Sequence, residues 1–218
     1  MNLEYIQAIL PALLKGTWQT LQVFFLTLVL SLPLGLPFAL GSISRFFPVR
    51  FLSKAYIWVF RGTPLMLQLF FVYYGLPIMF GPAFRMENTV AAVLTFTMNY
   101  AAYFAEIYRS GIESIPKGQY EAATLLGYSR GQTFFRIVLP QMVKNVLPSV
   151  TNEVITLVKD TSLVYSLSYI EMFAVAKQIA AAQTTVLPFF IAGVYYYIFN
   201  YVVAGVMELF EKKLNYYH

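Results

Sequence analysis

The chain has no cysteine and a single histidine, His218, which is its last residue. Without cysteine it forms no disulfide, and thiol redox chemistry is excluded. One histidine also excludes zinc sites built from His and Cys and catalytic triads that depend on His. Neither H-E-x-x-H nor G-x-S-x-G occurs. We therefore predict no catalytic residue and no metal site, and an intramembrane enzyme is strongly disfavoured.

Charge is also scarce. Only 11% of the 218 residues are charged and 59% are hydrophobic, whereas a soluble domain has about 25% charged residues. A membrane-spanning helix needs roughly 20 apolar residues. Four runs contain no Asp, Glu, Lys or Arg: 16–44, 62–84, 88–105 and 178–207. The composition predicts an all-α integral membrane protein.

We expect five transmembrane helices in one membrane domain covering 1–218. Their expected spans are approximately 17–40, 54–80, 88–108, 142–165 and 186–209, with an external segment at 166–185. Residues 3–14 suggest a short interfacial helix before the first span, which Pro33 and Pro37 are expected to kink. The second span is broken at 61–64, where Thr63 is placed to cap a helix starting at Pro64. The N-terminus lacks the basic start of a cleaved signal peptide.

The net charge of +5 suits a membrane protein better than a nucleic-acid partner, because Lys and Arg mark cytoplasmic loops. Ten of them fall on one side of the expected spans: Arg45, Arg50, Lys54, Arg109, Lys117, Arg130, Arg136, Lys144, Lys212 and Lys213. The other side has three: Lys15, Arg85 and Lys177. The bias predicts an outside N-terminus and a cytoplasmic C-terminus.

The long loop at about 112–140 then lies in the cytoplasm. Ser114 is a predicted N-cap for a helix that begins at Pro116 and Lys117, and Gly127 a predicted C-terminal cap. Ser129 is expected to cap a second short helix, which Pro140 ends. The pattern alone fits two structures equally, a helix lying on the lipid headgroups and a compact knob that docks on a partner.

The motifs of this loop carry a family resemblance. Glu121-Ala122-Ala123, three residues, Gly127, nine residues and then Ile137-x-Leu139-Pro140 resembles the EAA signature of membrane subunits of bacterial ABC importers. Two further strings, Arg61-Gly62-Thr63-Pro64-Leu65 and Lys159-Asp160-Thr161-Ser162-Leu163, are similar to strings of the polar amino-acid permease branch, the histidine/glutamine type. The resemblance covers essentially the whole chain.

The resemblance implies a type I (MetI-like) importer permease fold in the bacterial cytoplasmic membrane. It implies two separate ATP-binding subunits, a second permease copy or paralogue, and an extracytoplasmic amino-acid-binding protein as partners, besides membrane lipid and without nucleic acid. The loop would form coupling helices, which dock on the ATPase through Tyr120, Glu121, Ala122, Ala123, Gly127 and Arg130. ATP and Mg would bind only to the partner. In agreement, the chain contains no Gly-Lys dipeptide and hence no phosphate-binding loop.

Polar residues interrupt the spans in pairs seven residues apart, Arg61 with Gln68, Asn99 with Glu106 and Glu153 with Asp160. Seven residues are about two helical turns, so each pair is predicted to share a face. At ~1.5 Å per residue, Glu153 lies roughly 15 Å inside a core about 30 Å thick. Asn99 has a similar depth, which predicts a substrate site near the midplane.

We assign substrate-binding roles from the chemistry of an amino acid. Asp160 would hold the α-ammonium, Glu153 a cationic side chain, and Thr161 and Ser162 the carboxylate if the fourth span breaks there. Further hydrogen bonds are expected from Asn99, Asn152, Thr156 and Gln68. Alternatives remain open: Asp160 and Glu153 pairing with Arg61 or Lys159, and Asn99 bonding only between helices. Glu106 and Arg109 are expected to form a structural pair.

The preferred function is an importer subunit for basic L-amino acids. One alternative is the same type of subunit with specificity for glutamine or another polar amino acid. A different class is a passive oligomeric channel, which would explain inward polar residues but not the EAA loop. Pairing with an identical or a related permease is equally compatible with the sequence.

Overall fold

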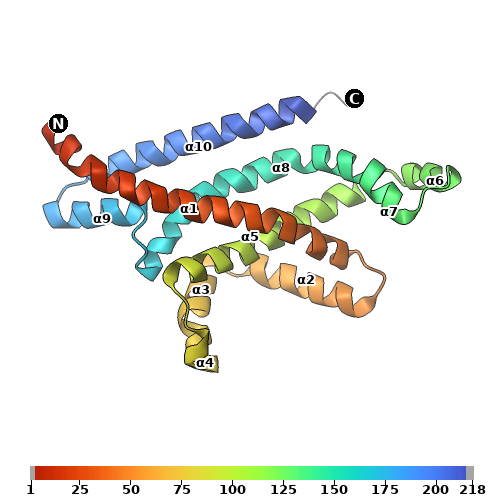
Figure 1. The fold of residues 1–218 in the computed structure, drawn as a ribbon, viewed down its shortest axis with the longest axis horizontal. Helices are drawn as coiled ribbons and strands as arrows, with labels where there is room; N and C mark the ends of the chain where they lie inside the picture. Colours follow the sequence, from red (N-terminus) through yellow and green to blue (C-terminus); the bar gives the residue numbers. More distant parts are fainter. Residues whose placement is uncertain (1–2, 215–218) are drawn as a thin grey trace.

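The computed structural model describes residues 3–214, and every regular element in that range is helical. Four long helices run along the longest axis of the molecule: α1 (Leu3–Ser42), α5 (Asn88–Glu113), α8 (Leu139–Asp160) and α10 (Leu187–Leu214) (Figure 1). Helix α5 packs against both α1 and α8, and α10 packs against α8. The all-α prediction is confirmed.

Among the described residues, three helices are long and apolar enough to cross a membrane: Gln7–Ser42 of α1, α5 and α10. The pair Phe47–Gly62 and Leu65–Phe80 qualifies as a fourth, broken span with a bend of 107°. Helix α8 has the length of a span but does not meet the same criterion, because charged and amide side chains such as Lys144, Asn145 and Glu153 lower its hydropathy. The count of five spans is therefore not confirmed.

Helix α1 is continuous over 40 residues, so the prediction of a separate interfacial helix at 3–14 was wrong. Prolines within membrane helices are tolerated because their surroundings satisfy the freed backbone groups. Gly16 accounts for the contact of α1 with the segment that follows α8. A Cβ at Gly16 would lie 2.9 Å from Cα of Met172, closer than atoms pack, so only glycine permits this approach.

The second span breaks where it was expected, between α2 (Phe47–Gly62) and α3 (Leu65–Phe70). Pro64 has no backbone N–H and therefore cannot donate the bond that would continue α2. Helix α3 begins one residue later than predicted, because Pro64 is its N-cap, without a side-chain cap bond. Thr63 does not cap α3; its hydroxyl donates to the Val59 carbonyl at 2.8 Å and closes the end of α2.

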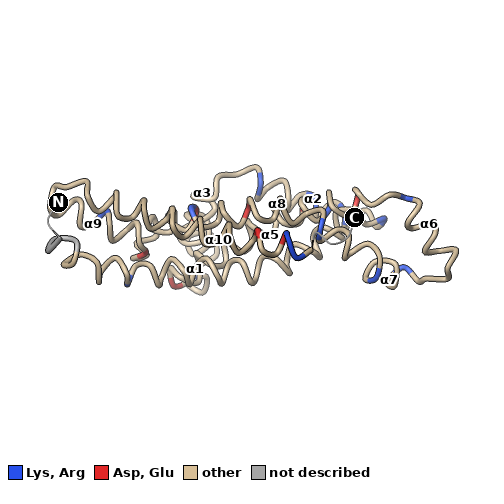
Figure 2. The backbone as a smooth tube through the Cα atoms, turned by 90° about the horizontal axis from the view of Figure 1, so that it is seen from above, with Lys and Arg blue, Asp and Glu red and all other residues tan. Residues whose placement is uncertain are grey.

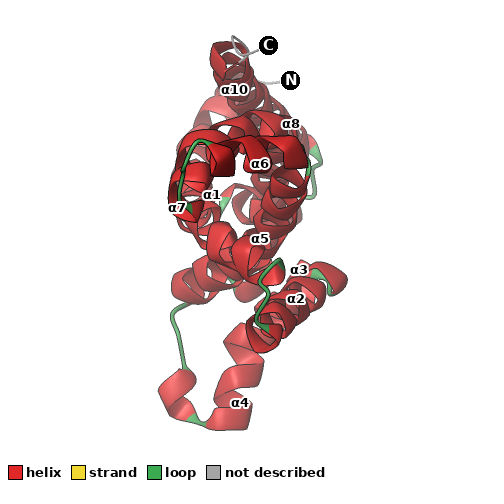
Figure 3. Ribbon diagram, turned by 90° about the vertical axis from the view of Figure 1, so that its right-hand side faces the viewer, coloured by secondary structure: helices red, strands yellow, loops and turns green. Residues whose placement is uncertain are grey.

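Beyond the break, the chain projects away from the four long helices (Figures 1 and 3). It continues as η1 (Phe71–Gly75), α4 (Leu76–Phe80) and η2 (Pro82–Phe84) before α5 begins. Side chains such as Ile78 and Met79 are largely exposed there.

The α-helical pairing of α8 ends at Asp160, and the chain continues as the 3-10 segment η4 (Thr161–Leu167). The condition set for Thr161 and Ser162 is thus met only as a change of pairing, because Thr161 keeps right-handed helical angles, and the sharp break lies at Gly62–Pro64. The expected external segment also contains a helix that the sequence reading missed, α9 (Met172–Gln183). The buried carboxylate of Glu171 caps α9 by accepting bonds from the Phe173 and Ala174 backbone N–H groups.

The cytoplasmic loop of the prediction folds as α6 (Lys117–Leu125), α7 (Arg130–Thr133) and η3 (Phe134–Val138). Gly127 has φ +78°, and the bonds from Gly127 N to Thr124 O and from Tyr128 N to Ala123 O end α6 in a Schellman motif. The glycine cap is thus confirmed. Ser129 caps α7 in a capping box with Gln132, as predicted.

Two other predictions for this loop were wrong. Ser114 does not cap α6, because Pro116 is the N-cap and the Ser114 hydroxyl donates to the Gly111 carbonyl of α5. Pro140 does not end the second helix either. The π-helical pairing of η3 precedes Pro140, and the chain continues as α8 to Asp160. Since proline occupies an early position of α8, few backbone bonds are lost.

Candidate substrate cleft and coupling loop

A cleft of about 490 Å³ lies where the α2–α3 break meets α5 and α8. Eleven residues line it: Arg61, Gly62, Thr63, Pro64, Leu65, Asn99, Tyr100, Tyr103, Glu153, Thr156 and Asp160. The volume is in the range of small-molecule sites. The cleft brings together four of the eight predicted substrate-binding residues, Asn99, Glu153, Thr156 and Asp160.

The two carboxylates of α8 face the same cleft, as their spacing predicted. Within the described residues, neither Glu153 nor Asp160 has a cationic partner within 4.0 Å, so the alternative pairings with Arg61 and Lys159 are not formed. Asp160 instead accepts a hydrogen bond of 2.7 Å from the Tyr100 hydroxyl. Two half-buried carboxylates without a salt bridge make the cleft attractive to cations.

Arg61 also lines the cleft, although the sequence suggested it only as a possible partner of the two carboxylates. Its guanidinium carbon lies 5.3 Å from the centre of the Tyr103 ring, a cation–π distance. Its Nη1 lies 3.8 Å from Glu106 Oε1. The predicted pair of Glu106 and Arg109 is confirmed, with Nη2 and Oε1 2.5 Å apart, and Glu113 extends it. Arg61 thus joins the cleft to a row of charged residues on α5.

Gln68 does not line the cleft. The prediction that it shares a helical face with Arg61 was wrong, because the 107° bend separates them. Its amide nitrogen donates to the carbonyls of Phe60 at 2.8 Å and Thr63 at 3.0 Å. Asn99 donates to the same Phe60 carbonyl at 3.0 Å and to Gln68 Oε1 at 2.9 Å. These amides therefore bond the backbone at the break.

The remaining predicted substrate residues lie outside the cleft lining. The hydroxyl of Thr161 donates to the Val158 carbonyl and that of Ser162 to the Lys159 carbonyl, each within its own helical run. Asn152 is exposed on α8. The sequence analysis did not predict Tyr100 and Tyr103 as cleft residues. Tyr103 lies four residues after Asn99 on α5 and therefore shares its helical face, whereas Tyr100, the residue directly after Asn99, does not.

The predicted coupling residues gather at one end of the molecule, on α6 and α7. Ala123 is buried and Tyr120 half-buried against the base of the loop, and burial raises the pKa of the Tyr120 phenol. Glu121, Ala122, Gly127 and Arg130 are exposed. At the tip, Leu125 and Leu126 are 89% and 75% exposed. An apolar tip on a polar loop is typical of a surface that a partner covers.

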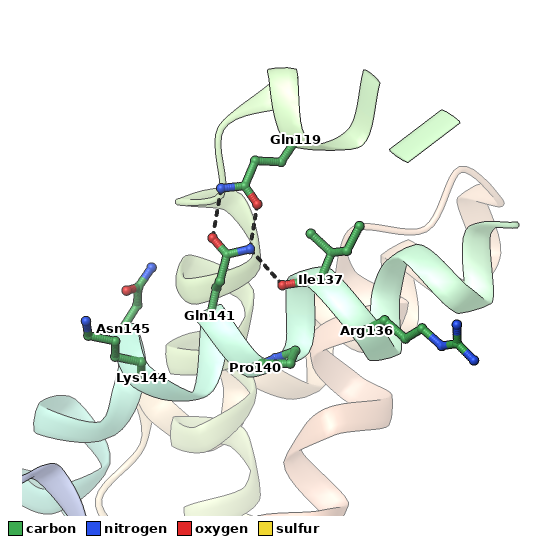
Figure 4. Close-up of a pocket in the computed structure, with 7 residues that line it drawn as sticks. All are labelled: Gln119, Arg136, Ile137, Pro140, Gln141, Lys144 and Asn145. Carbon is green, nitrogen blue, oxygen red and sulfur yellow. Dashed lines mark hydrogen bonds between the residues drawn. The ribbon is translucent and has the colours of Figure 1, made fainter. Parts of the chain in front are cut away.

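The loop is tied to α8 by a pair of side-chain amides (Figure 4). Gln119 of α6 donates to Gln141 Oε1 at 2.8 Å, and Gln141 donates back to Gln119 and to the Ile137 carbonyl. The pair lines a second cavity, of about 560 Å³, together with Arg136 and Pro140. The knob is therefore attached to the base of α8 by specific bonds as well as by the chain itself.

The charges of the described residues are unevenly distributed along the molecule. Lys and Arg gather toward the end that carries α6 and α7, and few lie near α9 (Figure 2). Helix α1 begins at the end opposite α6 (Figure 1). In the described part of the chain, no group of three or more His, Cys, Asp and Glu side chains is arranged to hold a metal ion.

Residues 31–216 match the family described as the binding-protein-dependent transport system inner membrane component. The chain belongs to this family. The permease is 39% identical to the arginine transport system permease protein ArtQ of Bacillus subtilis (strain 168), over 99% of each chain. The matched family and the amino-acid permease name of this relative confirm the resemblance inferred from the EAA loop.

Solved structures agree with the family. The permease superposes with a TM-score of 0.88 and 29% identity on a chain of "an amino acid ABC transporter with histidines", covering 98% of this chain and 99% of that one. A chain of the MetNI methionine ABC transporter in an inward-facing conformation gives a TM-score of 0.79 at 19% identity, covering 99% and 100%. The latter likeness shows the MetI-like fold alone. The permease is a membrane subunit of an amino-acid importer whose family works with separate ATPase subunits.

Proposed function

We propose that this permease forms the membrane path of an ATP-driven importer for basic L-amino acids, that is arginine, lysine or histidine. The observation that carries the proposal is the pair Glu153 and Asp160, which face one cleft without a salt bridge. A substrate with two cationic groups would neutralise both carboxylates. A neutral side chain such as that of glutamine would leave one carboxylate unpaired at a cost.

The lining suggests how such a substrate would lie. Asp160, oriented by Tyr100, would receive the α-ammonium, and Glu153 the cationic side chain. The α-carboxylate would face the α2–α3 break, where Arg61 is the only cationic side chain among the described residues that line the cleft. Thr156 and Asn99 would add polar contacts. The hydroxyls of Thr161 and Ser162 are used by their own helical run, so a role for them in this arrangement has no support.

Energy would enter through the loop. The exposed apolar tip and the EAA residues would dock on one ATP-binding subunit, which binds the ATP and Mg that this chain has no loop to hold. Two such subunits and a second permease, identical or related, would complete the membrane complex. A binding protein would deliver the amino acid from outside. The charge distribution supports a cytoplasmic position for α6 and α7 and for the C-terminus, with the N-terminus outside.

The proposal is tested by direct binding to the purified permease–ATPase complex, which removes the selectivity of the binding protein. Glu153→Gln should lower the preference for arginine over glutamine by at least about tenfold, the equivalent of ~1.4 kcal/mol. Asn152→Ala, at an exposed position next to it, is the matched control and should change neither affinity. An unchanged arginine preference in Glu153→Gln would contradict the proposal. Flux through liposomes containing the permease alone would favour a passive channel.

A further inference from the structure

The α2–α3 break creates a structural problem that two side chains solve. A helix end leaves its last carbonyl groups without intrahelical partners, and inside a membrane such groups are costly unless the protein satisfies them. The break also turns the chain by 107°. Its residues from Gly62 to Leu65 form one wall of the cleft. Any movement of the break would therefore change the shape of the cleft.

Gln68 bonds both sides of the break from the first turns of α3. Its amide nitrogen lies 2.8 Å from the Phe60 carbonyl oxygen, 3.0 Å from the Thr63 carbonyl oxygen and 2.8 Å from the Thr63 hydroxyl oxygen. The Thr63 hydroxyl in turn donates to the Val59 carbonyl. The carbonyls of Val59, Phe60 and Thr63 thus accept hydrogen bonds from side chains. In a continuous helix, backbone N–H groups would have been the donors.

Asn99 fixes this arrangement to the most buried helix of the molecule. It is 4% exposed on α5, and its amide nitrogen donates to the Phe60 carbonyl and to Gln68 Oε1. The two amides and the Phe60 carbonyl form a closed triangle that joins α2, α3 and α5. Both N–H groups of Asn99 are used, so a ligand in the cleft can meet its side chain only at the Oδ1 acceptor.

We infer that Gln68 is a positioning residue for substrate binding, which with Asn99 clamps the α2–α3 break so that Gly62–Leu65 forms a fixed wall of the cleft. The inference rests on the proposed function in that the cleft is the substrate site. It assigns Gln68 an indirect role, since Gln68 does not line the cleft. It also explains why a glutamine stands where the sequence alone suggested a direct ligand.

Because this chain has no cysteine, a local test is possible with a cysteine-free ATP-binding subunit. In Gly62→Cys one spin label on each permease chain that carries the change would report the motion of the break, and a Cβ at this position meets no other atom within 4 Å outside its chain neighbours and helix backbone. The label is placed on the permease–ATPase complex. Adding Gln68→Met, which has a similar length and no amide, should increase the label's mobility. Gln119→Met is the matched control, because it removes an amide pair at the coupling loop, and it should leave the spectrum unchanged.

Binding is measured on the same complex without the label. Gln68→Met should weaken arginine binding by about tenfold and glutamine binding by the same factor, because the carboxylates are unaffected. Unchanged mobility would overturn the clamp, and increased mobility with unchanged affinity would overturn its role in positioning. If Gln68→Met does not assemble, Thr63→Val removes the two bonds of the Thr63 hydroxyl and keeps those of Gln68 to Phe60 and Asn99, so it should give the same changes at smaller size. Loss of selectivity in Glu153→Gln tests the proposed function separately.

Discussion

The hydroxyl of Tyr100 on α5 donates a hydrogen bond of 2.7 Å to Oδ2 of Asp160 on α8. Tyr100 is buried among aromatic neighbours, so its ring has little freedom to move. The bond holds one carboxylate oxygen in a fixed place and leaves the other available. An ammonium group in the cleft would then meet an oriented acceptor.

Tyr100→Phe is expected to weaken binding of every amino acid by roughly tenfold, since a hydrogen bond to a charged group contributes about 1.5 kcal/mol. The change keeps the ring and its packing. Equilibrium binding of arginine and glutamine to the permease–ATPase complex measures it. A loss restricted to arginine would show that Tyr100 acts on the side-chain end of the substrate instead.

Asp160→Asn is expected to reduce binding of all amino acids because it removes the charge that faces the α-ammonium. The sharper measurement compares arginine with its analogue lacking the α-amino group. The unaltered permease should prefer arginine, and Asp160→Asn should reduce that preference toward equality. If Asp160→Asn leaves the ratio of the two affinities unchanged, the ammonium contacts another residue.

Glu121→Lys is expected to abolish stimulation of ATP hydrolysis by the loaded binding protein while the permease remains folded in the membrane. Glu121 is exposed on α6, so the reversal of its charge affects a docking surface and no core contact. Glu208→Lys on α10 is a matched reversal of an exposed carboxylate, which pairs only with Lys212 at 2.7 Å within the described residues. Stimulation should survive there. Normal stimulation in Glu121→Lys would contradict docking through this face.

Gly16→Ala tests the contact of α1 with the start of α9. Its Cβ would meet the Met172 backbone at 2.9 Å, and overpacking of this kind costs about 1–3 kcal/mol. The thermal unfolding temperature of the solubilised complex should fall by several degrees. Gly205→Ala on α10 has no atom within 4 Å of the added Cβ and should not lower it. Equal unfolding temperatures for the two variants would show that α1 and α9 adjust freely.

Local chemistry made part of the fold predictable. The break at Pro64, the glycine cap at Gly127 and the capping box at Ser129 follow from single residues whose backbone preferences act within one turn. The two long helical runs could not be predicted from single residues in this way. Neither Leu3–Ser42 nor Phe134–Asp160 ends at its prolines, because a proline stops a helix only where no π-helical segment, early helical position or neighbouring group compensates for the missing N–H.

The cleft was predictable on one helix and not across helices. Glu153, Thr156 and Asp160 share a face by spacing alone, so α8 was read correctly. The role of Gln68 at the α2–α3 break depends on a 107° bend and on a contact with Asn99, 31 residues away in sequence. Tyr100 likewise finds Asp160 only through the packing of α5 on α8. Such pairings depend on the fold as a whole, and no spacing within one element contains them.

The uninterrupted helical run from Phe134 to Asp160 has a thermodynamic consequence. It is roughly 40 Å long at ~1.5 Å per residue, with the Gln119–Gln141 tie near one end and Asp160 at the other. A ligand at Asp160 and a partner at the loop would be coupled if both favour the same placement of this run. By linkage, each would then change the affinity for the other by the same factor, so the coupling energy could be measured from either end.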